Sequence, residues 1–200
     1  MYNETMIIIV GLGNPGDEYC NTRHNIGWIV LEAFIEVHGL PSLTSSKLFA
    51  SKLSEGVIGG TDVSVLLPTT YMNNSGGPVA KYVKTHAEHV LVVVHDDVDL
   101  AYGDVKVSYD RGAGGHNGVR SIISSYGSPK FIRVRIGIAK TGFFGGIKRP
   151  KGDGLSNFVL GTFTKKEEEE LSDISARVDI ALQHIIKEGV AYAMQEVNGK

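Results

Sequence analysis

The sequence predicts an α/β fold, in which a single domain of residues 1–200 holds a twisted mixed sheet flanked by helices on both faces. Two apolar runs of strand length, at residues 6–10 and 90–94, alternate along the chain with segments of helical periodicity. The length of 200 residues and the 42% content of hydrophobic residues suit one domain with a sizeable core. No shift in composition marks a linker between domains.

Periodicity predicts the elements in order. After the strand at 6–10, a helix is expected over 26–38, because apolar residues recur there at helical spacing, with Asn25 as its N-cap and Gly39-Leu40-Pro41 as its stop. The remaining expected elements are strands at 48–58 and 62–67 around a Gly59-Gly60 turn, a helix at 79–85 with Pro78 in its first turn, a strand at 90–94, a strand at 105–109, a helix at 119–126, a strand at 131–139, and a helix at 164–187. Thr164 and Glu167 form a predicted capping box for that last helix, which we interpret as a packing helix.

Composition excludes several classes of protein. Cys20 is the only cysteine, which excludes an internal disulfide and fits a reducing compartment. No apolar run is long enough to cross a membrane, and residues 1–5 are too short and too acidic for a signal peptide. The sequence therefore predicts a cytoplasmic protein without a membrane partner.

Basic residues are concentrated in one region of the chain. Residues 103–151 hold ten basic residues and two acidic ones, a net charge of +8, whereas the whole chain carries −2. Such a region beside a polar glycine loop predicts a surface for a polyanion, so we expect a phosphate-rich substrate.

Three polar motifs stand in turn-prone or glycine-rich surroundings, where packing alone does not require a His or an Asn. They are Thr22-Arg23-His24-Asn25, Tyr71-Met72-Asn73-Asn74-Ser75-Gly76 and Gly114-Gly115-His116-Asn117-Gly118. Because these side chains move protons and orient carbonyl groups, the three motifs together indicate an active site.

The glycines after the first strand also match a nucleotide-binding pattern. Gly11-Leu12-Gly13-Asn14-Pro15-Gly16 satisfies the dinucleotide fingerprint G-x-G-x-x-G. However, residues 17–25 are polar and lack a helical stripe, and no strand ending in an acidic ribose ligand follows at the proper distance. We therefore expect no dinucleotide and interpret the glycine turn as the holder of Asn14, although a dinucleotide-binding enzyme stays open as an alternative.

A histidine and a carboxylate are the candidates for proton transfer. His24 lies in a polar segment just before the first helix, and Asp96 follows the strand at 90–94. The carboxyl ends of strands face the ligand crevice of open α/β folds. A carboxylate placed there can fix the tautomer of an imidazole and stabilise its protonated form.

A metal-dependent hydrolytic site is a second alternative. The available nitrogen and oxygen ligands are His24, His95, Asp96, Asp99 and His116. Their spacing matches no recognised ligand pattern, and the motif asparagines suit an amide or ester carbonyl better than zinc. We therefore expect no metal and no other cofactor.

Further motifs join these three in a fixed order. They are Pro68-Thr69-Thr70 before the second motif, His95-Asp96-Asp97-Val98-Asp99-Leu100, Arg133-Val134-Arg135-Ile136-Gly137-Ile138 and Phe158-Val159-Leu160-Gly161. With them, essentially the whole chain resembles the bacterial-type peptidyl-tRNA hydrolase family. The resemblance implies a monomeric, metal-independent esterase that cleaves the bond between a peptide and the terminal ribose of tRNA, recycling peptidyl-tRNA from aborted translation. An RNA-binding module without activity is the remaining alternative.

The resemblance also implies roles for individual residues. It makes His24 the general base and Asp96 the carboxylate that orients it. Asn14 and Asn73 correspond to asparagines that position the water, the base and the substrate, and Asn117 to the one that binds the peptide carbonyl or the developing oxyanion. The residues implied to line the substrate pocket are Tyr19, Met72 and His116.

Basic residues that hold the phosphate at the tRNA end are implied as well. One of them matches Arg135. The chain departs from the family pattern at Ser108, where relatives often have a basic residue, which leaves the second phosphate ligand open between Lys106 and Arg111. Residues 140–154 are basic, rich in glycine and longer than the family's usual loop, so we expect them to be mobile and to contact RNA.

Overall fold

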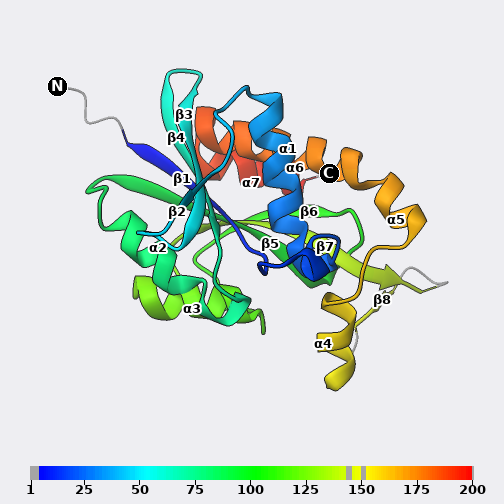
Figure 1. Ribbon diagram of the computed structural model, residues 1–200. Coiled ribbons are helices and arrows are strands. Elements are labelled where there is room, and N and C mark those ends of the chain that lie inside the picture. Colours follow the sequence, from blue (N-terminus) through cyan, green and yellow to red (C-terminus); the bar gives the residue numbers. More distant parts are fainter. Residues whose placement is uncertain (1–4, 143–145, 150–151, 200) are drawn as a thin grey trace.

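The computed structural model describes residues 5–142, 146–149 and 152–199, and its strands form one mixed sheet (Figure 1). The strand order is β2-β3-β4-β1-β5-β7-β6, and β8 pairs with β7. The strands are β1 (Met6–Gly11), β2 (Thr44–Ser46), β3 (Ser51–Ile58), β4 (Thr61–Pro68), β5 (His89–Ala101), β6 (Val105–Tyr109), β7 (Ile132–Thr141) and β8 (Ile147–Lys148). Strands β4, β1, β5 and β7 run parallel in the centre, whereas β2, β3, β6 and β8 join antiparallel.

Helices cover both faces of the sheet, which confirms the predicted fold class (Figure 1). The α-helices are α1 (Ile26–Val37), α2 (Gly76–Val83), α3 (Asn117–Tyr126), α4 (Asp153–Val159), α5 (Lys165–Glu169), α6 (Leu171–Glu188) and α7 (Val190–Asn198). Short 3₁₀ turns are η1 (Asp17–Tyr19), η2 (Arg23–Asn25) and η3 (Met72–Asn74). Helices α1 and α6 pack on one face, and α2 and α3 pack on the other. None of the described helices combines the length and hydropathy that a membrane span requires.

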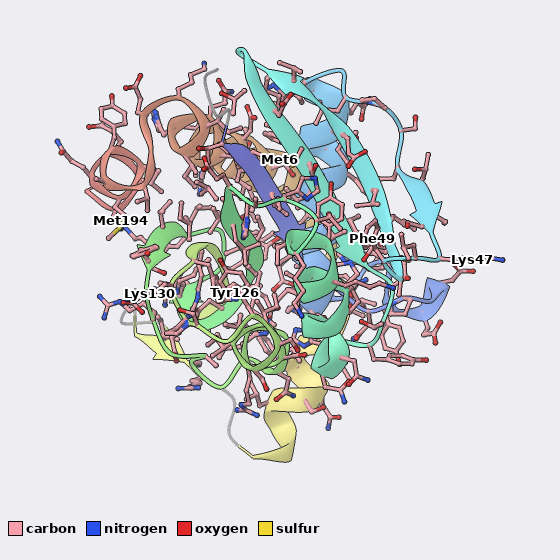
Figure 2. All side chains as sticks on the ribbon, turned by 90° about the vertical axis from the view of Figure 1, so that its left-hand side faces the viewer. Met6, Lys47, Phe49, Tyr126, Lys130 and Met194 are labelled. Carbon is pink, nitrogen blue, oxygen red and sulfur yellow. The ribbon has the colours of Figure 1, made fainter. Side chains whose placement is uncertain are left out.

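The core is divided between these two faces. Phe34 of α1 and Leu182 of α6 are fully buried on the first face, and Tyr82 of α2 and Ile122 of α3 on the second. Phe49, labelled in Figure 2, packs edge-on against Tyr82 with ring centroids 5.0 Å apart. Apolar side chains on both faces of β1 and β5 explain why these strands appear in the sequence as continuous apolar runs.

Several predicted boundaries are wrong. The strand expected at 48–58 begins only at Ser51 as β3, because residues 47–50 form a turn in which Ala50 has a positive φ of 44°, and the short strand β2 before that turn was not expected. The helix expected at 164–187 is interrupted at Glu170 between α5 and α6, although the capping box of Thr164 and Glu167 is present as predicted. Helices α4 and α7 and strand β8 were not anticipated.

The most consequential boundary error concerns β5. The apolar run ends at Val94, so the sequence predicts that Asp96 follows the strand. In the structure β5 continues to Ala101, and Asp96 pairs in register with Ile136 of β7. A register shift between Asp97 and Ala101 then interrupts the ladder, as β-bulges do beside active sites.

Two glycines of the fingerprint motif, Gly11 and Gly13, allow close packing of α1 against the segment of β1 and its following turn. A Cβ on Gly13 would lie 2.7 Å from the ring of Trp28. On Gly27, facing it from α1, a Cβ would lie 2.6 Å from the backbone oxygen of Val94. The helix begins only at Ile26, well after the glycines, so its N-terminus is not formed by the glycine turn.

The contact between α2 and α3 gives a stability prediction. A Cβ on Gly76 would lie 2.0 Å from the backbone oxygen of Ser121, whereas a Cβ on Gly77 would have no atom within 4 Å. We expect Gly76→Ala to lower the free energy of unfolding by about 3 kcal/mol, at the upper end of overpacking costs. Gly77→Ala, the matched control in the same helix, should change it by no more than about 1 kcal/mol. Urea denaturation measures both, and equal effects would contradict the close approach.

Candidate active site

A cavity of about 680 Å³ opens where the carboxyl ends of β1 and β4 meet the polar part of β5. Turns that follow β1 and β4, together with the glycine loop before α3, supply most of its wall. Eight of the ten site residues expected from the sequence line it, namely Asn14, Tyr19, His24, Met72, Asn73, Asp96, His116 and Asn117. Segments far apart in the sequence thus converge at the edge of the sheet where ligands bind in open α/β folds.

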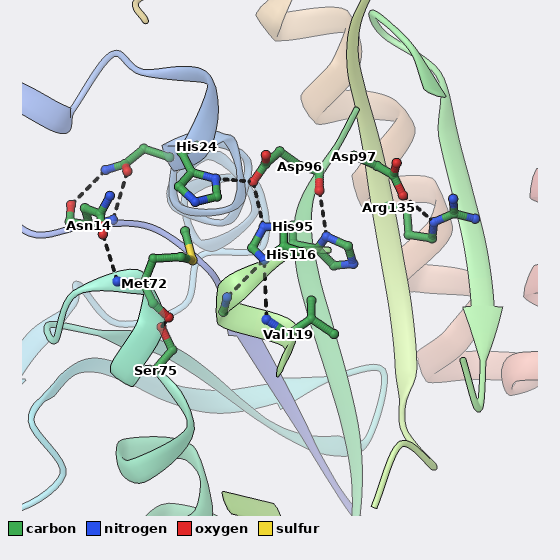
Figure 3. A network of polar contacts seen from close by, with 12 residues as sticks. Asn14, His24, Met72, Ser75, His95, Asp96, Asp97, His116, Val119 and Arg135 are labelled. Carbon is green, nitrogen blue, oxygen red and sulfur yellow. Dashed lines mark hydrogen bonds and ion pairs between the residues drawn. The ribbon is translucent and has the colours of Figure 1, made fainter. Parts of the chain in front are cut away.

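Two histidines meet one carboxylate oxygen at the wall of this cavity (Figure 3). Oδ1 of Asp96 lies 2.8 Å from Nδ1 of His24 and 2.9 Å from Nε2 of His116. The other ring nitrogen of His116 accepts hydrogen bonds from the backbone amides of Gly118 and Val119. Since an accepting imidazole nitrogen carries no proton, the proton of His116 lies on Nε2 and is donated to Asp96.

The other ring nitrogen of His24, Nε2, is available to take part in a reaction. An ionised carboxylate only accepts, so Nδ1 of His24 donates to Asp96. Its Nε2 has no hydrogen-bond partner among the described residues, and the ring lines the cavity. In its neutral form, His24 therefore presents an unprotonated Nε2 to the cavity, and a buried carboxylate orients the ring.

Burial and mutual attraction act in opposite directions on the ionisation of this pair. Burial lowers the pKa of His24, but the charge of Asp96 and the hydrogen bond to it outweigh burial, so the pKa is raised above 6.5. For Asp96, burial raises the pKa, whereas His24 and His116 hold it well below its ordinary value. Asp96 is thus a carboxylate at neutral pH, and it supports the protonated form of His24.

The segment that carries His24 is anchored by its neighbour. Arg23 is buried, and its guanidinium forms an ion pair with Glu167 at 2.7 Å and donates to the backbone oxygen of Gly161 at 3.2 Å. The same group lies 4.8 Å from the ring centroid of Phe158. Turn η2 is therefore anchored to α4, α5 and the segment between them.

Asn14 is held through both its backbone and its side chain. Its side-chain oxygen accepts from the amide of Met72 at 2.8 Å, and the Asn25 side chain bonds to its backbone N–H and C=O, each at 2.9 Å. Asn25 does precede α1, but its side chain does not cap the helix. Asn25 thus occupies the predicted N-cap position, but this tertiary contact replaces the capping hydrogen bond of its side chain. No described residue accepts a hydrogen bond from Nδ2 of Asn14, so its N–H groups are available to a ligand in the cavity.

The other two asparagines are exposed at the rim. Asn117 is the first residue of α3, and its side-chain oxygen accepts from Arg120 at 3.1 Å, which leaves its amide nitrogen as the free donor. Asn73 lies in η3, beside the buried Met72. Tyr19 and Tyr71 are in edge-on contact across the entrance, with ring centroids 6.4 Å apart.

A family model described as peptidyl-tRNA hydrolase matches residues 8–200. This chain belongs to the peptidyl-tRNA hydrolase family. A peptidyl-tRNA hydrolase from a Roseiflexus species is 42% identical over 196 residues, which cover 96% of this chain and 86% of the relative. One from Syntrophotalea carbinolica is 36% identical, with 98% of each chain covered. The crystal structure of peptidyl-tRNA hydrolase from Acinetobacter baumannii matches with a TM-score of 0.85 at 33% identity, covering 99% of this chain and 96% of that one.

In this peptidyl-tRNA hydrolase family member, the two basic residues expected from the resemblance lie outside the first cavity. Arg135 and Lys106 line a second cavity of about 620 Å³, which shares His95 and Asp97 with the first. Nε of Arg135 donates to Asp97 at 2.7 Å (Figure 3), and Nζ of Lys106 donates to the backbone oxygen of Asn198 at 3.1 Å. The two cavities are adjacent, so one ligand can reach both.

Helix α4 supplies lining residues that sequence reasoning missed. Leu155 and Val159 close one side of the first cavity. Together with Phe158 they recur at helical spacing, which is the signal that would have revealed the helix directly after the glycine-rich loop expected at 140–154. Parts of that loop, residues 143–145 and 150–151, lie outside the described residues. Arg149 lies within them, and it forms an ion pair with Asp99 at 3.0 Å.

The carboxylate and two histidines also have the composition of a metal site. One ligand atom from each of His24, Asp96 and His116 lies within 4.8 Å of the others. A histidine that binds a metal through Nε2 donates its Nδ1–H to a neighbour. In His116, Nδ1 instead faces two backbone N–H donors. If Nε2 bound a metal, the proton on Nδ1 would point at these N–H groups, which cannot accept it. The described residues fit a hydrogen-bonded triad better than a metal centre.

Proposed function

We propose that this protein hydrolyses the ester bond between an N-blocked peptide and the 3′-terminal ribose of tRNA, with His24 as the general base. The observation that carries the proposal is the buried contact of His24 with Asp96, which leaves Nε2 of the imidazole on the cavity wall. An ester is already an activated acyl group. A positioned imidazole and carboxamide donors therefore suffice for hydrolysis without a covalent nucleophile.

The reaction begins when Nε2 of His24 takes a proton from a water molecule, while Nδ1 stays bonded to Asp96. The water oxygen attacks the ester carbonyl, and the carbonyl oxygen becomes an oxyanion that accepts from the amide of Asn117. Collapse of this intermediate breaks the bond to the ribose oxygen. That oxygen takes the proton back from His24, which releases tRNA and a free peptide carboxylic acid.

The remaining lining residues position the substrate. Asn14 directs its free amide donors at the attacking water, and Asn73 holds the substrate from the opposite rim. Tyr19 and Met72 contact the peptide. His116 contributes through Asp96, whose charge it shares with His24. Arg135 holds the phosphate at the tRNA end, and Lys106 assists it from the neighbouring strand.

One assay tests this function against its alternatives. The purified protein is incubated with an N-blocked aminoacyl-tRNA and with its free-amine counterpart, in the presence of a chelator. Release of the amino acid from the blocked substrate only is the expected result. Loss of activity in the chelator would indicate a metal enzyme, and binding of tRNA without release would indicate an inactive RNA-binding module.

The contact of Asp96 with His24 gives a pH prediction. The base must be neutral, so kcat/KM rises with pH through the pKa of His24, which lies above 6.5. In Asp96→Asn the attractive charge is gone while burial remains, so the pKa of His24 falls and the acid limb moves to lower pH. The plateau rate should fall by less than in His24→Ala, because the amide oxygen still accepts a hydrogen bond. An unshifted acid limb would contradict the pairing as a source of basicity.

The monomeric state and the cytoplasmic location stay predictions from the sequence. Sedimentation of the purified chain tests the first, and cell fractionation tests the second. The assignment of residues 1–200 to one domain is checked by a single cooperative unfolding transition.

A further inference from the structure

The turn that carries His24 has little regular structure of its own. Turn η2 spans only three residues, and no side chain caps it. A single 3₁₀ turn does not hold its own position, because its hydrogen bonds are few and poorly aligned. The place of the His24 ring relative to Asp96 must therefore be set by contacts with other parts of the chain.

Arg23, directly before His24, is buried against a distant segment of the chain. Its side chain is 6% exposed, and that of Glu167, its ion-pair partner 144 positions later, is 12% exposed. Nη1 of Arg23 donates to the backbone oxygens of Phe158 at 3.5 Å and Gly161 at 3.2 Å, whereas its Nε is buried without a partner. Without Glu167, the buried guanidinium would therefore keep only backbone acceptors.

The backbone on either side of Arg23 is attached to the same distant segment. Residues 21–23 and 161–163 meet in an antiparallel bridge between Thr22 and Thr162, and backbone hydrogen bonds of 3.1 and 3.2 Å flank that bridge. These contacts do not depend on the side chain of Glu167. Replacement of Glu167 should therefore loosen the turn without detaching it, so the variants are expected to fold.

Glu167 is itself held in place by the start of α5. Its Oε2 accepts from the guanidinium of Arg23 and from the backbone amide of Thr164, each at 2.7 Å, and its backbone oxygen accepts from the hydroxyl of Tyr102. Burial raises the pKa of Glu167, but the hydrogen bonds from Thr164 and Arg23 outweigh burial and lower it. Glu167 is therefore an ionised and well-fixed partner for Arg23 at neutral pH.

We propose that Glu167 is a positioning residue for the hydrolysis, because through Arg23 it fixes the imidazole of His24 against Asp96. This inference rests on the proposed function, in which His24 is the general base. Glu167 lines neither of the two cavities, so it acts through Arg23 and not on the substrate. A general base must stand within hydrogen-bond reach of the water, and a misplacement of about 1 Å costs up to about 10²-fold in rate.

Two substitutions of Glu167 separate its position from its charge. Glu167→Ala removes the contact with Arg23 and should lower kcat for N-blocked aminoacyl-tRNA by about ten-fold, as a slightly displaced base does. Glu167→Gln keeps an oxygen that accepts from Arg23 and Thr164, so it should retain kcat within about three-fold. Equal losses in the two variants would show that the charge acts and not the placement, which would overturn the proposal.

Two controls come from the same helix and its cap. Glu168→Ala removes the neighbouring carboxylate, which is exposed, and Thr164→Ala removes the capping hydroxyl but leaves the ion pair of Arg23 with Glu167. Both should keep kcat within about two-fold, as substitutions away from a site usually do. Melting temperatures are recorded for all variants. A loss of kcat in Thr164→Ala as large as in Glu167→Ala would trace the effect to the cap and overturn the proposal.

A double substitution distinguishes positioning of His24 from a general weakening of the enzyme. If Glu167 acts through His24, then adding Glu167→Ala to His24→Ala should leave the residual kcat unchanged within about two-fold, because the group that was positioned is already absent. A role apart from His24 would lower the residual kcat by about ten-fold again, as in the single variant. That second result would overturn the proposal.

NMR signals of the His24 ring report its position without any substrate. The proton on Nδ1, which is bonded to Asp96, should give a signal that is shifted or broadened in Glu167→Ala and unchanged in Glu168→Ala. An unchanged signal in Glu167→Ala would overturn the proposal even if kcat fell. If wild type does not hydrolyse the ester, the proposed function fails while this signal still tests the contact, so the two failures are distinguishable.

Discussion

Replacement of His24 by alanine is expected to lower turnover by about 10² to 10⁴-fold, the usual range for removal of a positioned acid–base group. The imidazole is the group that has a buried carboxylate on one nitrogen and the cavity on the other. No other described histidine with a free nitrogen lies at the first cavity in contact with the Asp96 side chain, because both nitrogens of His116 are engaged. Single-turnover hydrolysis of N-blocked aminoacyl-tRNA measures the loss directly.

The matched control is His184→Ala on α6, where the side chain lines neither of the two cavities described above. It should retain wild-type turnover. Since His24 is buried, the thermal transition of His24→Ala must also be recorded, and a folded variant is expected. A folded variant with near-wild-type turnover would show that His24 is not the base.

Replacement of Asn117 by aspartate should lower kcat by about 10² to 10³-fold with a much smaller change in KM, as loss of an oxyanion donor does. The side-chain oxygen of Asn117 already accepts from Arg120, so the amide nitrogen is the donor that faces substrate. Aspartate keeps the shape but replaces this donor with an oxygen that repels the developing negative charge.

Asn74→Asp is the control for Asn117, because Asn74 is also exposed and belongs to a site motif but does not line the cavity. It should change kcat by less than about two-fold, as surface substitutions away from a site usually do. If the loss in Asn117→Asp were confined to KM, Asn117 would be a ligand of the peptide in the ground state only.

The sequence predicted the fold class and eight of the residues that line the first cavity, for different reasons. Apolar periodicity located the central strands and α1 because packing there is dense and regular. The contact of Asp96 with a distant histidine was also anticipated, although its place inside β5 was not. Where β5 becomes polar at the site, it loses the apolar pattern by which a strand is recognised in a sequence. The end of such a strand is therefore predicted too early.

The sequence could not predict contacts in which a residue distant in the chain takes the place of a local partner. The position of Asn25 predicts a capping hydrogen bond to the helix, yet its side chain forms hydrogen bonds with the backbone of Asn14 instead. The burial of Arg133 could not be predicted either, because Arg135 stands two residues away in the same motif and only burial separates the two. Helix α4 was missed because glycines and basic residues dominate the segment before it.

In the proposed reaction, the shared oxygen of Asp96 couples the basicity of His24 to the glycine loop that lines the cavity. Its two donors come from positions 72 and 20 residues away, one in η2 and one in the glycine loop that also carries Asn117. A loop change that withdraws His116 leaves more of the carboxylate's charge to His24, so it makes the imidazole more basic. Redesign of the glycine loop for a different acyl group would therefore also alter the working pH of the enzyme. Acyl specificity and pH response cannot be varied independently at this site.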